Sequence, residues 1–386
     1  MRDAVICRAV RSPVGKRNGG LSGLHAVDLS AQVLTALVDA AGVDPSVVDD
    51  VFWGCVTQAG EQTYNIARNA VLAAGWPQSV PGTSIDRQCG SSQQAVAFAA
   101  ATVISGQADV IVAGGVESMS RVPMGSSIGD GTIGEPFSPH FLERYDGIRP
   151  NQGIGAEMMA ERWGFTRTQL DEYSLRSHEQ AAKAQADGAF DAEIAPVTTG
   201  EGVVAADEGI RPGGTLEKLA ALKTPFKPDG VISAGNASQI SDGAAAVLVT
   251  TSDKAHELGL RPLVRIHTTV VAGDDPVIML SAPIPATAKA LDRAGLSIDD
   301  IGAFEVNEAF APVPLAWLAE TGADPATVNP RGGAIALGHP LGGSGARLMA
   351  TLIHHMQASG IRYGLQTMCE AGGMANATIL ELVGTE

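Results

Sequence analysis

Along most of this chain, apolar segments as long as a buried strand alternate with helical patterns. The clearest are "AVICRAV" (4–10), "ADVIVAGGVES" (108–118), "GAAAVLVTT" (243–251) and "PLVRIHTTVVAG" (262–273). Strands that lack regular polar alternation are typical of a sheet covered by helices on both faces. The sequence therefore predicts an α/β fold built on a parallel or mixed sheet.

This alternation stops between residues 119 and 243. The segment is polar, contains several Gly and Pro residues, and shows helical patterns only near 155–163 and 168–187. Connections inside compact domains are usually short, so such a long irregular segment predicts an excursion with a function. We expect an N-terminal unit of residues 1–118 plus 244–262, a loop domain at 119–243 and a C-terminal unit at 263–386.

Helices are expected at 26–43, at 65–75, directly after Cys89, at 285–295 and from Glu308 through Trp317. An order of loop, helix, strand and Gly-Gly occurs twice in the chain. It begins at Cys89 in the first half and at "LGHPLGG" (337–343) in the second. This weak repeat predicts two similar halves, each a layered α/β unit.

Charge and cysteine content exclude several classes of protein. The net charge of −16 over 386 residues weighs against a nucleic acid or an anionic membrane as partner. No stretch approaches the roughly 20 apolar residues of a membrane-spanning helix, and the N-terminus lacks a signal-peptide pattern. The four cysteines show neither metal-ligand spacing nor a disulfide framework. We expect a cytoplasmic, reduced and metal-free protein with no membrane partner.

Cys89 lies in "SIDRQCGSSQQAVAF" (84–98), at the start of a predicted helix. Free amides and the positive end of the helix dipole favour a thiolate and would lower the pKa of the thiol. The neighbouring amides could also bind an oxyanion. The alternative is a small buried apolar residue, which is what most free cysteines are. Gly90 and Ser91 favour the nucleophile, because they leave room above the sulfur.

His339 lies among glycines in "GGAIALGHPLGGSGAR" (332–347). Such a backbone turns sharply and allows another group to approach closely, and histidine is the usual general base near neutral pH. The alternatives are a glycine-rich turn with an incidental histidine, or a phosphate-binding loop. The second lacks the Walker spacing and its lysine.

Cys369 and Asn307 each end a predicted strand. Cys369, just before Ala371, could act as an acid or base beside a second oxyanion pocket, or be a strand-end core residue. Asn307 could orient a water or a carbonyl group, or cap the following helix, since Asn is among the best N-cap residues.

Six motifs together resemble one family. They are "RQCGSSQQA" (87–95), "GGVESMS" (114–120), "GNASQISDGAAA" (235–246), "VNEAFAP" (306–312), "NPRGGAIALGHPLGGSGAR" (329–347) and "TMCEAGG" (367–373). In this order they resemble the thiolases, the acyl-CoA:acetyl-CoA C-acyltransferases, over nearly the whole chain. The resemblance implies the thiolase fold, with two similar layered α-β-α-β-α halves and an inserted loop domain.

The resemblance also implies roles for individual residues. Cys89 would carry the acyl group as a thioester, His339 would activate it, and Cys369 would move a proton to and from substrate. Asn307, through a water, and His339 would form one oxyanion site. The backbone amides of Cys89 and Ala371 would form the other, because the reaction passes through two thioester carbonyls.

The loop domain would cover CoA, which is a substrate together with acyl-CoA; no permanently bound cofactor is expected. The positions that match CoA-contacting residues, or offer a nearby positive charge, are Ser238, Met279, Phe310, Asn151 and Lys223. The family pattern also implies a homodimer or a homotetramer built as a dimer of dimers.

Departures from the family pattern indicate the subgroup. The usual triple glycine after the second cysteine reads Glu370-Ala371-Gly372-Gly373 here. After Cys89, Ser92 and Gln93 replace the commoner Gly-Leu pair. Asn151 replaces a histidine that is common at this position. The motifs look closer to actinobacterial thiolases of lipid and steroid-side-chain degradation.

Four alternatives stay open at this point. They are a short-chain acetoacetyl-CoA thiolase, a ketoacyl synthase, a cysteine hydrolase and a thiolase-like carrier of lipid or CoA. Cys369 weighs against a synthase, and two reactive thiols weigh against a carrier.

Overall fold

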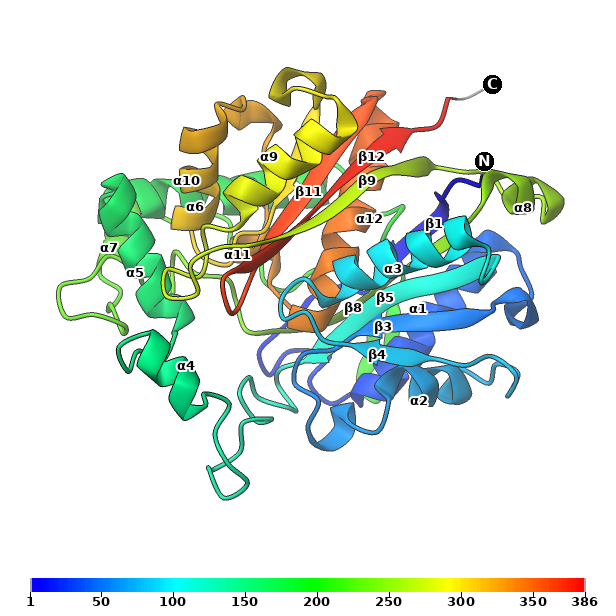
Figure 1. The fold of residues 1–386 in the computed structure, drawn as a ribbon, viewed down its shortest axis with the longest axis horizontal. Helices are drawn as coiled ribbons and strands as arrows, with labels where there is room; N and C mark the ends of the chain where they lie inside the picture. Colours follow the sequence, from blue (N-terminus) through cyan, green and yellow to red (C-terminus); the bar gives the residue numbers. More distant parts are fainter. Residues whose placement is uncertain (1, 385–386) are drawn as a thin grey trace.

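The computed structural model describes residues 2–384 and is built on a ten-stranded mixed sheet (Figure 1). The strand order is β10-β11-β12-β9-β1-β8-β5-β3-β4, and β2 pairs with β8 beside this path. A separate hairpin pairs β6 with β7. The strands are β1 (Val5–Arg11), β2 (Gly15–Lys16), β3 (Asp50–Gly54), β4 (Thr83–Ile85), β5 (Val110–Ser118), β6 (Val197–Thr199), β7 (Gly202–Val204), β8 (Ser241–Thr250), β9 (Val264–Gly273), β10 (Ala303–Val306), β11 (Tyr363–Glu370) and β12 (Met374–Leu382).

Helices connect these strands and cover the sheet. The α-helices are α1 (Ala26–Ala41), α2 (Ile66–Ala73), α3 (Ser91–Ser105), α4 (Pro139–Arg144), α5 (Gln152–Trp163), α6 (Arg167–Ala186), α7 (Leu216–Ala220), α8 (Ser252–Glu257), α9 (Pro283–Ala294), α10 (Pro312–Thr321), α11 (Ala334–Leu337) and α12 (Leu341–Ser359). Short 3-10 helices lie at Pro45–Val47, Gly60–Gln62, Ile298–Asp300 and Pro325–Thr327.

The two halves of the sheet repeat one pairing pattern. Strands β3, β5, β8 and β1 pair in that order as parallel, antiparallel and antiparallel. Strands β10, β11, β12 and β9 do the same. The halves join where Val5 and Ile6 of β1 pair with Arg265 and Val264 of β9. The repeat that the sequence predicts is therefore present in the topology.

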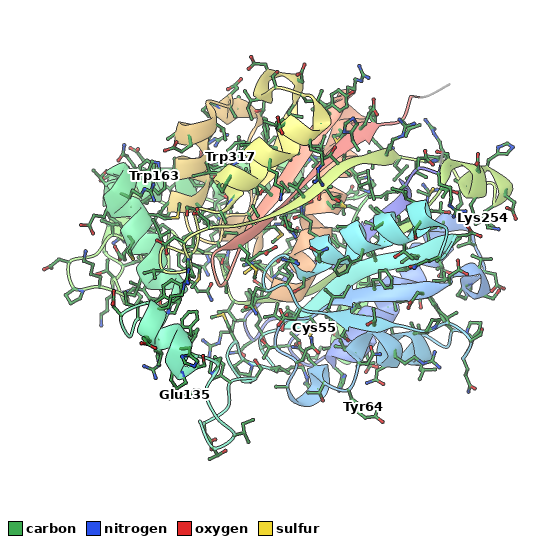
Figure 2. All side chains as sticks on the ribbon, viewed as in Figure 1. Cys55, Tyr64, Glu135, Trp163, Lys254 and Trp317 are labelled. Carbon is green, nitrogen blue, oxygen red and sulfur yellow. The ribbon has the colours of Figure 1, made fainter. Side chains whose placement is uncertain are left out.

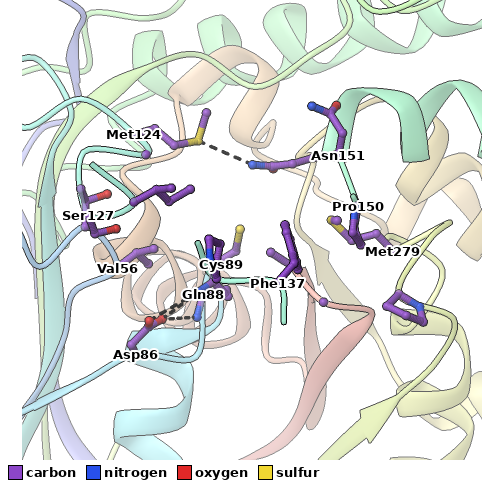
Figure 3. Close-up of a pocket in the computed structure, with 18 of the residues that line it drawn as sticks. Val56, Asp86, Gln88, Cys89, Met124, Ser127, Phe137, Pro150, Asn151 and Met279 are labelled. Atoms are coloured by element: carbon purple, nitrogen blue, oxygen red, sulfur yellow. Dashed lines mark hydrogen bonds between the residues drawn. The ribbon is translucent and has the colours of Figure 1, made fainter. Parts of the chain in front are cut away.

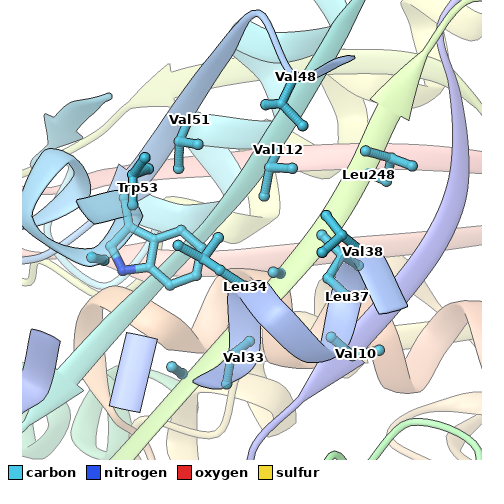
Figure 4. Packing of buried hydrophobic residues seen from close by; sticks show 14 of the residues in the cluster. Val10, Val33, Leu34, Leu37, Val38, Val48, Val51, Trp53, Val112 and Leu248 are labelled. Atoms are coloured by element: carbon cyan, nitrogen blue, oxygen red, sulfur yellow. The ribbon is translucent and has the colours of Figure 1, made fainter. Parts of the chain in front are cut away.

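Helices α3 and α12 pack against each other and against strands of both halves. Their shared core is made of small and branched side chains, because close helix packing needs residues such as Ala95 and Ala99. Helix α1 covers the outer face of the first half, where Trp53 is fully buried (Figure 4). Helix α9 covers the second, with Trp317 buried there, while Tyr64 extends into solvent (Figure 2). The predicted layered α/β architecture is confirmed.

The apolar run at 108–118 is a strand as predicted, but its Gly-Gly pair does not follow the strand as the repeat implied: β5 runs past Gly114 and Gly115 to Ser118. A Cβ at Gly114 would lie 2.1 Å from the Ala245 carbonyl oxygen, and one at Gly115 would lie 2.2 Å from that of Gly342, so neighbouring backbones require glycine there. In contrast, Gly372 and Gly373 form the turn between β11 and β12 with φ values of 86° and 73°.

Helix α10 begins at Pro312 rather than at Glu308. The preceding residues instead contact the loop domain: the Ser238 amide donates to the Ala309 carbonyl, and the Ala311 amide donates to the Asn236 carbonyl, both at 2.9 Å. The N-cap position belongs to Ala311. Asn307 is therefore not a helix cap.

Among residues 2–384, no helix has both the length and the apolar character needed to cross a membrane. Within the same range no group of three or more His, Cys, Asp or Glu side chains could hold a metal ion.

Candidate active site

A tight turn between β4 and α3 carries Cys89. Gln88 has a φ of 49°, which is uncommon for a residue with a side chain. The Asp86 carboxylate accepts a hydrogen bond from the Gln88 amide at 2.7 Å. Ser91 Oγ accepts from the Arg87 amide at 2.9 Å and donates to the Gln88 carbonyl at 2.6 Å. The turn is therefore fixed by its own side chains.

The Cys89 thiol, 7% exposed, lies on the wall of a cleft of about 760 Å³ (Figure 3). The cleft lies between the Cys89 turn, the loop-domain segment 124–152, residues 276–279 and the turn between β11 and β12. Its apolar lining includes Met124, Ile128, Ile133, Phe137, Phe141 and Leu341.

Four of the predicted residues line this cleft, namely Cys89, Ala371, Met279 and Asn151. The other predicted residues do not line it; they are His339, Cys369, Asn307, Ser238, Phe310 and Lys223. The first three of these are buried deeper in the protein.

The neighbours of His339 decide which ring nitrogen carries the proton. Its Nδ1 lies 2.6 Å from Ser344 Oγ, and that hydroxyl donates its single hydrogen to the Pro340 carbonyl at 2.8 Å. Ser344 therefore accepts from Nδ1–H, which leaves a lone pair on Nε2. Asn307 Nδ2 lies 3.4 Å from that Nε2.

Burial and, to a smaller extent, the positive charge of Arg347 together lower the pKa of His339 to about 3. The ring is therefore neutral near pH 7, with Nε2 able to accept a proton. The Asn307 Oδ1 atom is buried and has no hydrogen-bond partner within the described residues.

The thiols are also neutral at rest. Burial raises the pKa of Cys89 well above its usual value, and Cys369 and Glu370 add to this effect. Burial likewise raises the pKa of Cys369 to about 12. The expectation of a lowered Cys89 pKa is wrong, because desolvation outweighs the amides at the start of α3. As a nucleophile, Cys89 would therefore first have to lose its proton.

Helices α3 and α12 bring the Cys89 turn and the His339 loop to the same end of the fold. Ser92 Oγ accepts a hydrogen bond from the Ala346 amide at 2.9 Å. A Cβ at Gly345 would lie 2.3 Å from the Gln93 amide nitrogen, so only glycine allows this approach. Gln93 Nε2 also donates to Thr378 Oγ1 at 2.9 Å. The Ser92-Gln93 departure thus connects the two helices and the second half of the sheet.

The sequence reasoning missed the structural role of Glu117. Its carboxylate accepts from the amides of Val56 at 3.0 Å, Thr57 at 2.9 Å and Gly342 at 2.9 Å, and from Gln62 Nε2 at 2.8 Å. It therefore ties the end of β3 to the start of α12, just after His339. A lone glutamate in the apolar strand of "GGVESMS" was the available signal.

Glu308 is a second missed carboxylate. It accepts from Tyr173 OH at 2.9 Å, from Ser177 Oγ at 2.7 Å and from the Ile335 amide at 3.1 Å. These bonds join the segment after Asn307 to helix α6 of the loop domain and to α11.

The candidate CoA-contacting residues are dispersed. Asn151 caps α5, with Oδ1 accepting from two amides at 3.0 and 3.1 Å. Phe310 packs edge-on against Phe226, with ring centroids 6.1 Å apart. Ser238 is half-buried, and Lys223 is exposed outside the cleft lining. Ala371 does not adopt a positive φ, so its methyl group fits where the family has glycine.

Family models described as thiolase N-terminal domain and thiolase C-terminal domain match residues 4–253 and 260–382. The chain is 51% identical to a steroid 3-ketoacyl-CoA thiolase of Mycobacterium tuberculosis, over 99% of this chain and 94% of that protein. It is 45% identical to a β-ketoadipyl-CoA thiolase of Escherichia coli, over 99% of this chain and 100% of that protein. A crystal structure of the Bacillus anthracis acetyl-CoA acetyltransferase superposes with a TM-score of 0.92 at 39% identity, covering 99% of each chain.

Proposed function

This chain belongs to the thiolase family of acyltransferases, and we propose that it performs the CoA-dependent thiolytic cleavage of 3-ketoacyl-CoA through an acyl-Cys89 thioester. The likeness to actinobacterial steroid-degrading thiolases, expected from the motifs, is confirmed by the M. tuberculosis relative. The observation that supports the residue roles is that Cys89 and Ala371 both line the cleft.

The first half-reaction acylates the enzyme. His339 Nε2 takes the Cys89 proton as the sulfur attacks C3 of the substrate. The C2–C3 bond breaks, its electron pair passes to C2, and the Cys369 thiol protonates C2 to release acetyl-CoA. A neutral base and a neutral thiol fit this order, because charge forms only as substrate reacts.

The second half-reaction returns the enzyme to its starting state. The Cys369 thiolate takes the proton of a free CoA thiol, whose sulfur attacks the carbonyl of acyl-Cys89. The bond from that carbonyl to Cys89 breaks, and the imidazolium of His339 returns the proton to Cys89. The products are acyl-CoA and acetyl-CoA, and no other reactant is needed.

Two oxyanions need donors during these steps. The amides of Cys89 and Ala371 bind the alkoxide that forms at C3. The thioester oxygen of the leaving acetyl-CoA is bound by His339 Nε2–H, which exists once the ring has taken the proton, and by a water held on Asn307. The base thus becomes a donor at the moment when the second oxyanion forms.

The acyl group that this cleft suits is bulky and apolar. The lining residues Ile128, Ile133, Phe137 and Phe141 belong to the loop domain and present aliphatic and aromatic surface. A space of about 760 Å³ exceeds what an acetoacetyl group fills. The printed substrate class of the M. tuberculosis relative supports a steroid-type acyl chain.

The remaining proposals concern organisation. Residues 119–243 cover CoA, with Ser238, Met279, Phe310, Asn151 and Lys223 near it, between units 1–118 plus 244–262 and 263–386. We propose a homodimer or dimer of dimers; the half-exposed side chains of Phe98 and Ile104 on α3 support a partner surface. A cytoplasmic location agrees with four free cysteines.

Intact-protein mass spectrometry tests the reaction. The enzyme is mixed with acetoacetyl-CoA or with a steroid-type 3-ketoacyl-CoA, and CoA is then added. We expect an acyl adduct that Cys89→Ser abolishes and Cys7→Ala retains, and faster thiolysis of the bulky substrate. An adduct with acetoacetyl-CoA alone would contradict the substrate class, and no adduct from either would contradict the enzyme.

A further inference from the structure

Glu370, the last residue of β11, directly follows Cys369 in the chain. Its side chain is fully buried, at 0% exposure. Neither carboxyl oxygen has a hydrogen-bond partner among residues 2–384. A buried carboxyl without partners is costly, so its presence beside a reactive cysteine needs an explanation.

The carboxyl group packs under the Cys89 turn. A Cβ placed on Gly90 would lie 2.0 Å from Glu370 Oε1, so the carboxyl rests directly on the residue that follows the nucleophile. Met368, two residues earlier on the same face of β11, belongs to the same buried apolar cluster as Cys89. Asn376 Nδ2, from β12, donates to the Gly90 carbonyl at 3.1 Å. Glu370 therefore lies behind the nucleophile rather than in the cleft.

The charges that face Glu370 do not neutralise it. Arg87, on the Cys89 turn, favours the ionised form but makes no ion pair with it within 4 Å in the described part of the chain. Asp86, on the same turn, opposes ionisation, and β12 contributes the uncharged Asn376. Burial outweighs Arg87 and raises the pKa of Glu370 to about 8. Its negative charge, when present, raises the pKa of both Cys89 and Cys369.

We propose that Glu370 is a positioning residue whose buried carboxyl, packed on Gly90, must carry its proton for Cys89 to form a thiolate. This proposal rests on the proposed function, in which Cys89 is the nucleophile. In the protonated state Glu370 supports the Cys89 turn without adding charge. When it ionises, it places a negative charge beside the developing thiolate, which slows acylation. Glu370 thus sets the alkaline limit of the reaction.

Alkylation of Cys89 by iodoacetamide tests this without turnover, so its failure would leave the proposed function untouched. The rate follows the thiolate fraction and should rise about tenfold per pH unit below the thiol pKa. We expect this rise to break near pH 8 in the wild type, where Glu370 ionises. Glu370→Gln should lack the break, react as the wild type does below pH ~7, and react about tenfold faster at pH ~9.5.

Glu305→Gln is the matched control. Glu305 is also buried, its pKa is raised by burial to about 8, and it does not act on either cysteine. It should keep the break near pH 8. Glu370→Met, of similar size and unable to ionise, should repeat the Glu370→Gln result. A break that persists in both Glu370 variants would overturn the proposal, as would a change of equal size at every pH, which a merely structural role would produce.

Discussion

Ser344 Oγ accepts a hydrogen bond from His339 Nδ1 over 2.6 Å while it donates to the carbonyl of Pro340. This pair fixes the tautomer in which Nε2 can accept a proton, as the proposed mechanism requires. Ser344→Ala should leave the ring free to place its proton on Nε2. We expect kcat for thiolysis to fall by about 10- to 100-fold, with a smaller change in KM.

Ser174→Ala is the control for that loss. Ser174 is buried and donates to the carbonyl four residues earlier, as Ser344 does, yet no histidine among residues 2–384 forms a hydrogen bond with it. Its kcat should stay near the wild-type value. Equal losses in both variants, measured by steady-state thiolysis, would show that the Ser344 effect comes from packing instead of from the tautomer.

Cys369→Ala separates the two thiols. Cys89 should still be acylated by a pre-formed acyl donor, since His339 and the Cys89 turn are unchanged in this variant. Exchange of the α-protons of acetyl-CoA with solvent deuterium should be lost, because the variant lacks the thiol that we propose as the acid and base at C2. Deuterium incorporation followed by NMR measures this. Exchange at the wild-type rate would assign the proton transfer to another group.

Glu117→Gln should loosen both the segment after β3 and the start of α12. One carboxylate oxygen accepts from Val56 and Gly342, and the other from Thr57 and Gln62. An amide NH₂ in place of either oxygen would face donors only, at a cost of about 2–4 kcal/mol in unfolding free energy. Urea unfolding measures this loss, and kcat should fall as well because Gly342 positions the His339 loop. An unchanged unfolding midpoint would refute the linking role.

The layered fold could be predicted because its information is local. Apolar runs such as 110–118 and 243–250 identify strands without tertiary knowledge, and the motif order identifies the family. The start of α10 could not be predicted in this way. Residues 308–311 have helical propensity, but the Ser238–Ala309 and Asn236–Ala311 backbone bonds hold them against a segment about 70 positions earlier in the sequence.

The site could be predicted in its residues but not in its electrostatics. The motifs pointed to Cys89 and His339. Their protonation states depend on burial, which the sequence does not reveal: desolvation raises the pKa of one and lowers that of the other. Glu117 and Glu370 act through partners on other strands and helices, so no spacing along the chain identifies them.

Two buried carboxyls determine how the unfolding free energy depends on pH above about 6.5. Glu305 and Glu370 have folded-state pKa values of about 8, against an ordinary value of about 4.5. Between these values the folded state holds two protons that the unfolded chain has released. The unfolding free energy should therefore fall as pH rises from about 6.5 to 8, by up to about 1.4 kcal/mol per pH unit for each carboxyl. Glu305→Gln should make this slope shallower in urea titrations, and an unchanged slope would contradict the assignment.

The unfolding free energy should also fall at acid pH, because buried histidines have lowered pKa values. Burial lowers the pKa of His339 to about 3 and those of His178 and His355 to about 4. Between these values and the ordinary histidine pKa of about 6.5, the unfolded chain binds protons that the folded rings lack. Each ring should therefore lower the unfolding free energy as pH falls from about 6.5 to 4, by up to about 1.4 kcal/mol per pH unit. His178→Gln, away from the cleft, should remove one such contribution, so its unfolding free energy should fall less over this range than that of the wild type. An equal fall in both proteins, measured by urea titration, would contradict a neutral His178 ring in the folded state.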